Sequence, residues 1–346
     1  MLTRRFTLGS MLTDLFTRAP VGLLPVLIFL LVLVYLDSYK LVGLRTVLWV
    51  ILAGALLTVA GYWINGYVID ILAWDLQAYS RYAAPVVEEG LKATVMIFLF
   101  RTHRIGFLVD AAILGFAVGA GFGVVENFYY LYLASDAHIA VWVVRGFGTA
   151  IMHGGVMALF GIMAQTLTER SMRINPLYYL PGFLVAITIH SVFNHFPGTP
   201  IMTTLVTLIV LPLILMIVFQ KSARTMHEWL EVDFDEDAAL LEQINSGEFT
   251  ESRIGRFLED LKQMFPGTVV VDMLCYLRLY TELALRAKGV LMMRENGLDT
   301  PVGERTRAKF EEMHYLEKSI GKTGLLAMSP FLQMTRKDLW QLYVLE

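Results

Sequence analysis

The sequence predicts an all-α protein, a polytopic helical membrane bundle of about seven spans with a C-terminal helical soluble domain. Apolar residues make up 56% of the 346 positions, and the mean hydropathy is +0.58, which soluble domains rarely reach. Runs of about 18 mostly apolar residues, long enough to cross a bilayer as helices, recur through residues 1–221. Charged residues are concentrated after that point. These observations indicate a membrane domain followed by a water-exposed one.

Seven apolar runs are candidates for membrane spans. In chain order they cover residues 21–36, 46–64, 82–100, 107–133, 139–166, 177–196 and 201–220. Between the second and third runs, residues 65–81 mix Asp70 and Asp75 with aromatic side chains. This composition predicts a helix that lies in the membrane interface instead of crossing the membrane.

The fourth run contains a row of glycines. Gly115, Gly119 and Gly123 follow one another at four-residue spacing. Rows of small residues let helix backbones approach closely, so we expect this helix to pack tightly against its neighbours. Such packing would also bring polar side chains on those neighbours close together.

The charge distribution predicts two domains, residues 1–221 and 222–346. The first holds 13 Lys and Arg and 10 Asp and Glu, while the second holds 15 and 21. The second domain is therefore densely charged and net acidic. Residues 269–293 are almost long enough to span, but charged residues recur through them, so we interpret them as a soluble helix. The sequence does not identify a partner for this domain, whose role could be regulation or partner binding.

Composition excludes several kinds of site. Cys275 is the only cysteine, which excludes intrachain disulfides and metal sites built from cysteine clusters. No basic stripe indicates a nucleic-acid partner. The sequence predicts that the lipid bilayer surrounds the first domain.

Lysines and arginines near the span ends predict the orientation. Eight lie at one set of ends and five at the opposite set, which favours a cytoplasmic C-terminal domain. The eight are Lys40, Arg45, Arg101, Arg104, Arg170, Arg173, Lys221 and Arg224, and the five are Arg4, Arg5, Arg18, Arg81 and Arg145.

Two adjacent carboxylates, Glu88 and Glu89, interrupt the third span, with Lys92 one turn later. A charged side chain at mid-membrane costs about 2.5–3.5 kcal/mol on insertion scales, and such residues are by default candidates for function. A structural ion pair with Lys92 is the alternative. Residues four apart share a helix face, so Glu88 can meet Lys92. Glu89 points about 100° away from Glu88, so one carboxylate can be the working group while the other supports it.

Other spans carry polar residues that could share this site. Glu126 and Asn127 lie in the fourth span, His153 in the fifth, and His190 and Asn194 in the sixth. Successive spans run in opposite directions, so a shared layer must alternate between early and late positions along them. The glutamates and histidines follow this alternation, which predicts one polar layer. His190 can meet Asn194, four residues later.

Two carboxylates and two histidines in a dry site support two chemistries. A buried glutamate can take a proton from water with help from histidine. Alternatively, glutamate and histidine can bind a divalent metal, as in zinc hydrolases. His190 and Asn194 could also donate hydrogen bonds to an oxyanion. Both routes lead to hydrolysis of an acyl bond.

The motifs EEGLK (88–92), FGVVEN (122–127), His153 and HSVFN (190–194) together resemble the PrsW family of intramembrane proteases. That family is related to the CAAX-processing and bacteriocin-processing membrane proteases. The resemblance covers residues 82–220. It implies a site-1-type protease of the bacterial inner membrane, which cuts membrane-anchored substrates such as anti-sigma factors near the outer face.

The resemblance also implies roles for individual residues. Glu88 or Glu89 would activate water, Glu126 with His153 would complete the centre, and His190 with Asn194 would bind a metal or the oxyanion. Lys92 and Asn127 would support them. The ligands of a metal, with zinc as the expected ion, would be Glu89, Glu126, His153 and His190. Glu126 stands where the wider superfamily often has histidine, so glutamate-type and metal-type mechanisms both stay open.

Two other classes of protein could use buried glutamate and histidine. A proton-coupled transporter or channel relays protons through such groups, but transporters often show inverted repeats with broken helices, which the sequence lacks. A catalytically silent scaffold that presents the acidic domain is the third interpretation. The complete set of site residues argues against it.

Overall fold

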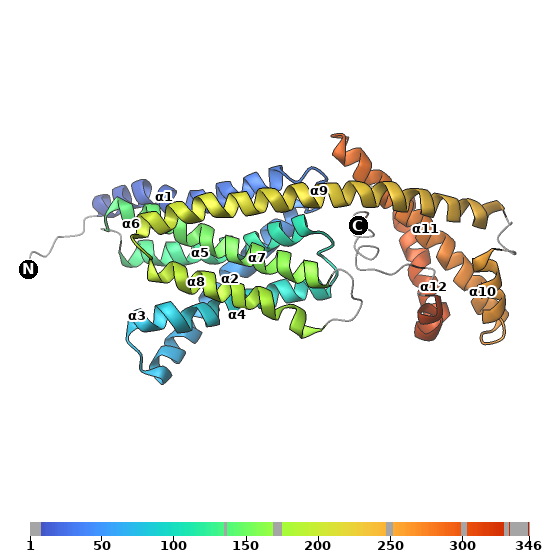
Figure 1. The fold of residues 1–346 in the computed structure, drawn as a ribbon, viewed down its shortest axis with the longest axis horizontal. Helices are drawn as coiled ribbons and strands as arrows, with labels where there is room; N and C mark the ends of the chain where they lie inside the picture. Colours follow the sequence, from blue (N-terminus) through green and yellow to red (C-terminus); the bar gives the residue numbers. More distant parts are fainter. Residues whose placement is uncertain are drawn as a thin grey trace, which may run out of the picture. The chain divides into compact units, whose positions relative to one another are not determined.

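The computed structural model describes residues 8–134, 137–168, 175–246, 252–298 and 303–328, together with Leu332 and Leu345. Over these residues the chain is helical and contains no strand. The elements, shown in Figure 1, are α1 (Leu8–Tyr35), α2 (Leu44–Leu72), α3 (Leu76–Ala78), η1 (Tyr79–Ala83), α4 (Ala84–Arg101), α5 (Leu108–Leu133), α6 (Ile139–Val143), η2 (Val144–Thr149), α7 (Ala150–Thr168), η3 (Pro176–Tyr178), α8 (Leu180–His195), α9 (Pro200–Ser246), α10 (Arg253–Leu261), α11 (Gly267–Glu295) and α12 (Glu304–Met328). The elements η1 and η2 are π-helices, and η3 is a 3-10 helix.

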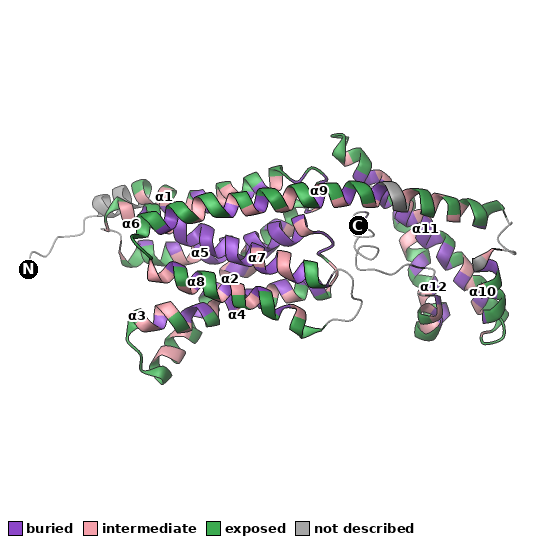
Figure 2. Ribbon diagram, viewed as in Figure 1, coloured by how far each residue is buried: buried purple, intermediate pink, exposed green. Residues whose placement is uncertain are grey.

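Among the described residues, six helices are long and apolar enough to cross a membrane, which confirms the expected polytopic bundle. They are Phe16–Tyr35, Leu44–Leu72, Leu108–Leu133, Ile139–Thr168, Pro176–His195 and Pro200–Ser246. The expected third span, α4, is a helix but is not one of the six, because four of its 18 residues are charged. It nevertheless packs against α2, α5, α7 and α8. Figure 2 shows α5 and α7 as strongly buried helices of the bundle.

The expected single helix at residues 65–81 is wrong, because the segment is broken at residues 73–75, while its placement in the interface stays a prediction. Helix α2 continues to Leu72 and ends at Ala73, whose φ of 51° is left-handed. A new helix starts at Leu76, where the Asp75 side chain accepts a hydrogen bond from the Ala78 amide at 2.9 Å. It runs through η1 into α4. The segment is thus the end of one helix and the start of the next, because the capping signal lies at Asp75.

The described chain divides into two compact units. The first holds most residues up to Ser222, and the second holds most residues from Ala223 onward. Each has its own hydrophobic core, built in the second unit by residues of α10, α11 and α12. Helix α11 includes the expected soluble helix at 269–293. Four arginines used for the orientation, Arg4, Arg5, Arg170 and Arg173, lie outside the described residues.

The glycine row on α5 allows the close approach that positions the site. A Cβ atom on Gly119 would lie 2.0 Å from the carbonyl oxygen of His153 in α7, and one on Gly115 would lie 2.3 Å from that of Met157. Gly121 turns toward α2, where a Cβ would lie 2.1 Å from the carbonyl oxygen of Ile51. Backbone therefore meets backbone on both sides of α5, which brings His153 within reach of side chains on α5.

Substitution of Gly119 by alanine is expected to destabilise the bundle. The added methyl group cannot fit beside the His153 carbonyl, so α7 must shift, at a cost of about 1–3 kcal/mol. Thermal unfolding in detergent should show a lower Tm than for wild type. Gly66→Ala is the matched control, because nothing lies within 4 Å of a Cβ there. Equal Tm values for the two variants would contradict this packing.

Candidate active site

Five glutamate and histidine side chains from four helices meet inside the bundle. Glu88 and Glu89 come from α4, Glu126 from α5, His153 from α7 and His190 from α8. Glu89, His153 and His190 are buried, while the side chains of Glu88 and Glu126 remain 14% and 22% exposed. The cluster therefore has a sealed inner part and two carboxylates on its more open side.

Glu89 is the centre of the sealed part. Its Oε1 accepts hydrogen bonds from Lys92 Nζ at 2.6 Å and from His190 Nδ1 at 2.7 Å, and lies 3.7 Å from His153 Nδ1. The expected pairing of Lys92 with Glu88 is therefore replaced by pairing with Glu89. Residues three or four positions apart share one side of a helix, so Lys92 could contact either glutamate. The rotation of α4 about its axis turns Glu89 and Lys92 toward the interior of the bundle.

Glu88 points to the more open side and is held from α2. Asn65 Nδ2 donates to Glu88 Oε1 at 3.1 Å, and the Tyr79 hydroxyl donates to Asn65 Oδ1 at 2.8 Å. The other carboxylate oxygen of Glu88 lies 3.9 Å from His190 Nε2. Glu89 contacts Nδ1 of His190, and Glu88 is thus oriented toward the other ring nitrogen, Nε2.

The hydrogen-bond partners assign the protons of both histidines. Lys92 has only donors, so the contact of 2.8 Å between Lys92 Nζ and His153 Nδ1 makes Nδ1 an acceptor. His153 Nε2 then carries the proton and donates it to Glu126 Oε2 at 3.1 Å. His190 donates from Nδ1 to Glu89, which leaves a lone pair on Nε2. The two rings lie 4.8 Å apart between centroids.

Glu126 is held by a second set of contacts. Arg145 Nη2 lies 3.1 Å from Glu126 Oε1, and Arg145 Nε donates to Asn127 Oδ1 at 2.9 Å. Asn127 is itself fully buried and donates to the Gly22 carbonyl oxygen at 2.7 Å. Asn127 therefore supports the site through Arg145 and does not enter the cluster.

The other expected supporting residue, Asn194, also binds outside the cluster. Its Nδ2 donates to the carbonyl oxygen of Ser80 at 2.8 Å, which ties α8 to η1. The Nδ2 group has two hydrogens and one of them is used here, so the expected contribution of Asn194 to an oxyanion site stays a prediction. His190 pairs with Glu89 in place of the expected Asn194.

Glu88, His153 and His190 fit a divalent metal. One ligand atom from each lies within 4.8 Å of the others. Zinc binds such ligands at about 2.0–2.2 Å, and one Glu with two His is a donor set of catalytic zinc sites. Metal-bound histidines commonly donate their other N–H to a carboxylate, as His190 does to Glu89.

The expected ligand set differs from this group in its carboxylates. Sequence reasoning named Glu89 and Glu126 with the two histidines. In the structure, Glu89 Oε1 is occupied by Lys92 and His190, and Glu126 is paired with Arg145. Glu88 is the carboxylate that completes the group of possible ligands.

Sequence reasoning missed Asn65, Tyr79 and Arg145. Asn65 and Tyr79 lie in the segment that we expect to lie in the interface. Arg145 is counted among the cations near the span ends, but it lies within the expected span 139–166, and the structure places it inside the apolar helix Ile139–Thr168. The signal that could have found it is the same one that found Glu88, a charged residue inside an apolar run.

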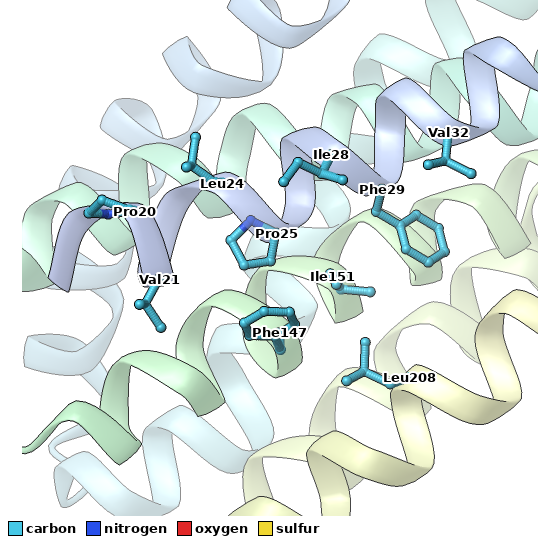
Figure 3. A pocket seen from close by; sticks show the side chains of 10 residues that line it. All are labelled: Pro20, Val21, Leu24, Pro25, Ile28, Phe29, Val32, Phe147, Ile151 and Leu208. Atoms are coloured by element: carbon cyan, nitrogen blue, oxygen red, sulfur yellow. The ribbon is translucent and has the colours of Figure 1, made fainter. Parts of the chain in front are cut away.

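A separate cavity of about 500 Å³ lies between α1, the η2–α7 segment and α9. Figure 3 shows Pro25 and Phe147 among its lining side chains, with Leu208 from α9. All its lining residues are apolar, so it offers no group for acid–base or metal chemistry. The titratable cluster is therefore the candidate active site.

Comparison with known protein families agrees with this geometry. Residues 42–219 match the family described as PrsW family intramembrane metalloprotease. The chain belongs to the PrsW family. The match confirms the resemblance drawn from the motifs, and it begins about 40 residues earlier than expected, so that it also includes α2. All five clustered residues lie within the PrsW match, and the main part of the second unit, from Ala223 onward, lies outside it. No curated protein and no solved structure matches the chain.

Proposed function

We propose that this chain is a metal-dependent intramembrane endopeptidase that hydrolyses peptide bonds of membrane-anchored proteins. The observation that carries the proposal is the convergence of Glu88, His153 and His190, with Glu126 beside them, from four helices of a membrane bundle. Burying several ionisable groups in such a bundle is costly. Carboxylate and imidazole groups in mutual contact can bind a metal ion and take a proton from water.

Glu88, His153 and His190 would hold the metal, for which zinc is the best candidate by its donor set. A bound divalent ion supplies Lewis acidity, which makes water acidic enough to lose a proton near neutral pH and polarises a carbonyl group. His153 carries a proton on Nε2 in the structure, donated to Glu126. A histidine binds a metal through an unprotonated ring nitrogen, so binding through Nε2 would require the His153 proton to move to Nδ1, with Lys92 giving up its contact there.

Glu126 is the general base of the proposed mechanism. It borders His153 and is partly exposed, so a water molecule and a peptide bond can reach it. Glu126 takes a proton from the attacking water and delivers it to the leaving amine, which is the usual exchange for such a base. We assign Glu88 as the working carboxylate of the pair and Glu89 as the supporting one, because Glu89 orients His190 and neutralises Lys92.

The position of the site supports the proposed substrate class. A peptide bond reaches a cluster within a helical membrane bundle most directly when it belongs to a membrane-anchored chain. We further propose the bacterial inner membrane as its location, as the PrsW resemblance implies. We also propose that the second unit is cytoplasmic, which the Lys and Arg count at the span ends supports.

Removal of metal is expected to abolish cleavage. The purified chain in detergent is incubated with a panel of single-pass helical peptides, and products are identified by mass spectrometry before and after chelation. Cleavage should disappear with the metal and return when Zn²⁺ is added back at one ion per chain. Cleavage that persists in a metal-free sample would contradict the metal part of the proposal and favour a glutamate mechanism. No cleavage of any peptide by the metal-loaded chain would contradict the whole.

A further inference from the structure

Arg145 occupies an unusual position in the helix that carries His153. It lies in η2, the π-helix Val144–Thr149, which continues directly into α7. Single π-helical turns inside longer helices are frequent at functional sites. Arg145 thus enters the bundle eight residues before His153 on one continuous helical segment.

Three contacts fix the guanidinium group of Arg145. Nη2 lies 3.1 Å from Glu126 Oε1, and Nε donates to Asn127 Oδ1 at 2.9 Å. The Arg145 Cζ atom also lies 3.7 Å from the centroid of the Tyr130 ring, a cation–π arrangement. A planar group with a partner at one edge, a partner at another and a ring on its face has little freedom to rotate.

The contacts beyond Arg145 anchor it to the rest of the bundle. Asn127 Nδ2 donates to the carbonyl oxygen of Gly22 in α1 at 2.7 Å and to that of Arg145 at 3.1 Å. Asn127 therefore holds both the backbone and the side chain of Arg145. Asn127 is adjacent to Glu126 on α5. Its hydrogen bonds therefore hold Arg145 beside the helical turn that carries Glu126.

The two oxygens of Glu126 face different partners. Oε1 lies beside Arg145 Nη2, and Oε2 accepts the proton of His153 Nε2 at 3.1 Å. The side chains of Glu126 and Arg145 remain 22% and 15% exposed. A partly exposed glutamate without such a partner could turn outward, so the fixed guanidinium determines where Oε2 points.

We propose that Arg145 is a positioning residue of the active site, which holds one oxygen of Glu126 so that the other stays directed at His153 and the reacting groups. The inference rests on the proposed function, in which Glu126 is the base. Arg145 acts through Glu126 and does not itself touch the substrate.

A double-mutant cycle tests whether Arg145 acts through Glu126. Peptide cleavage is measured under single-turnover conditions, with enzyme in excess, for wild type, Arg145→Met, Glu126→Gln and the double variant. Arg145→Met is expected to lower the cleavage rate about 10–100-fold, the size typical for residues that support a site from outside. Substrate affinity should be nearly unchanged. In the Glu126→Gln background, Arg145→Met should have almost no further effect, because residues that act as a unit are not additive.

Two further variants make the outcome decisive. Arg145→Lys keeps the charge but loses the planar fork, so its rate should lie between those of wild type and Arg145→Met, and it replaces the methionine variant in the cycle if that variant does not fold. Arg101→Met, at an exposed arginine in the last turn of α4, should cleave like wild type. If wild type cleaves and the two losses multiply, Arg145 acts independently of Glu126 and the inference is wrong while the function stands. If metal-loaded wild type cleaves nothing, the proposed function fails and the inference fails with it.

Discussion

Replacement of Glu126 by glutamine is expected to lower the rate of peptide cleavage about 10²–10⁴-fold, the usual contribution of a positioned general base. Glutamine has nearly the same shape, and in the metal-free chain its amide oxygen can accept from His153 Nε2 as Glu126 does at 3.1 Å. It cannot take a proton from water. The change should therefore act on the chemical step and leave the fold intact.

Two measurements separate this effect from a structural one. Glu126 is not among the three grouped ligands, so the glutamine variant should bind as much metal as wild type and unfold at a similar temperature. Asp70→Asn is the matched control, because it makes the same carboxylate-to-amide change at an exposed position of the bundle and should leave cleavage unchanged. A Glu126→Gln variant that cleaves at the wild-type rate, or one that loses its metal, would contradict the role assigned to Glu126.

Replacement of His190 by alanine is expected to remove both bound metal and cleavage. His190 is held by Glu89 at 2.7 Å through Nδ1, which leaves Nε2 directed toward Glu88. Without it, only two of the three grouped ligands remain. The metal content of protein purified in metal-free buffer should fall from one ion per chain to none, and cleavage should be lost with it.

The same helix offers a control for this prediction. His195 also lies in α8, but its ring contacts the Ser191 carbonyl and the Tyr82 hydroxyl outside the cluster. His195→Ala should keep its metal and its activity. His190→Asn, which fills more of the buried space than alanine, replaces the alanine variant if that variant unfolds. Wild-type metal content in the His190 variant, or metal loss in the His195 variant, would show that the ligands are elsewhere.

The fold and the polar layer could be predicted because both depend on patterns within single helices. Apolar runs marked the spans, and charges that recur through 269–293 marked α11 as a helix of the second unit. Alternation of depth predicted that residues from α4, α5, α7 and α8 would meet. The glycine row at Gly115 and Gly119 predicted close packing, and the structure places it against the α7 backbone.

The partner of each carboxylate could not be predicted, because it depends on how helices rotate against one another. Lys92 lies three residues from Glu89 and four from Glu88, and either spacing permits contact. Only packing of α4 against its neighbours decides that Lys92 bonds Glu89. Asn65 reaches Glu88 across 23 positions of the chain, and Arg145 reaches Glu126 from another helix. Neither contact corresponds to a residue spacing within a single helix, so no local sequence pattern predicts it.

We propose that this cluster hydrolyses peptide bonds within the membrane. Measuring the masses of the products formed in ¹⁸O-labelled water tests this directly. A single-pass helical peptide is incubated with metal-loaded wild type and with Glu126→Gln. We expect wild type to cleave within or beside the apolar segment and to leave one ¹⁸O atom in each new carboxyl terminus, and we expect almost no product from the variant. Equal products from both proteins, or no cleavage by wild type, would contradict it.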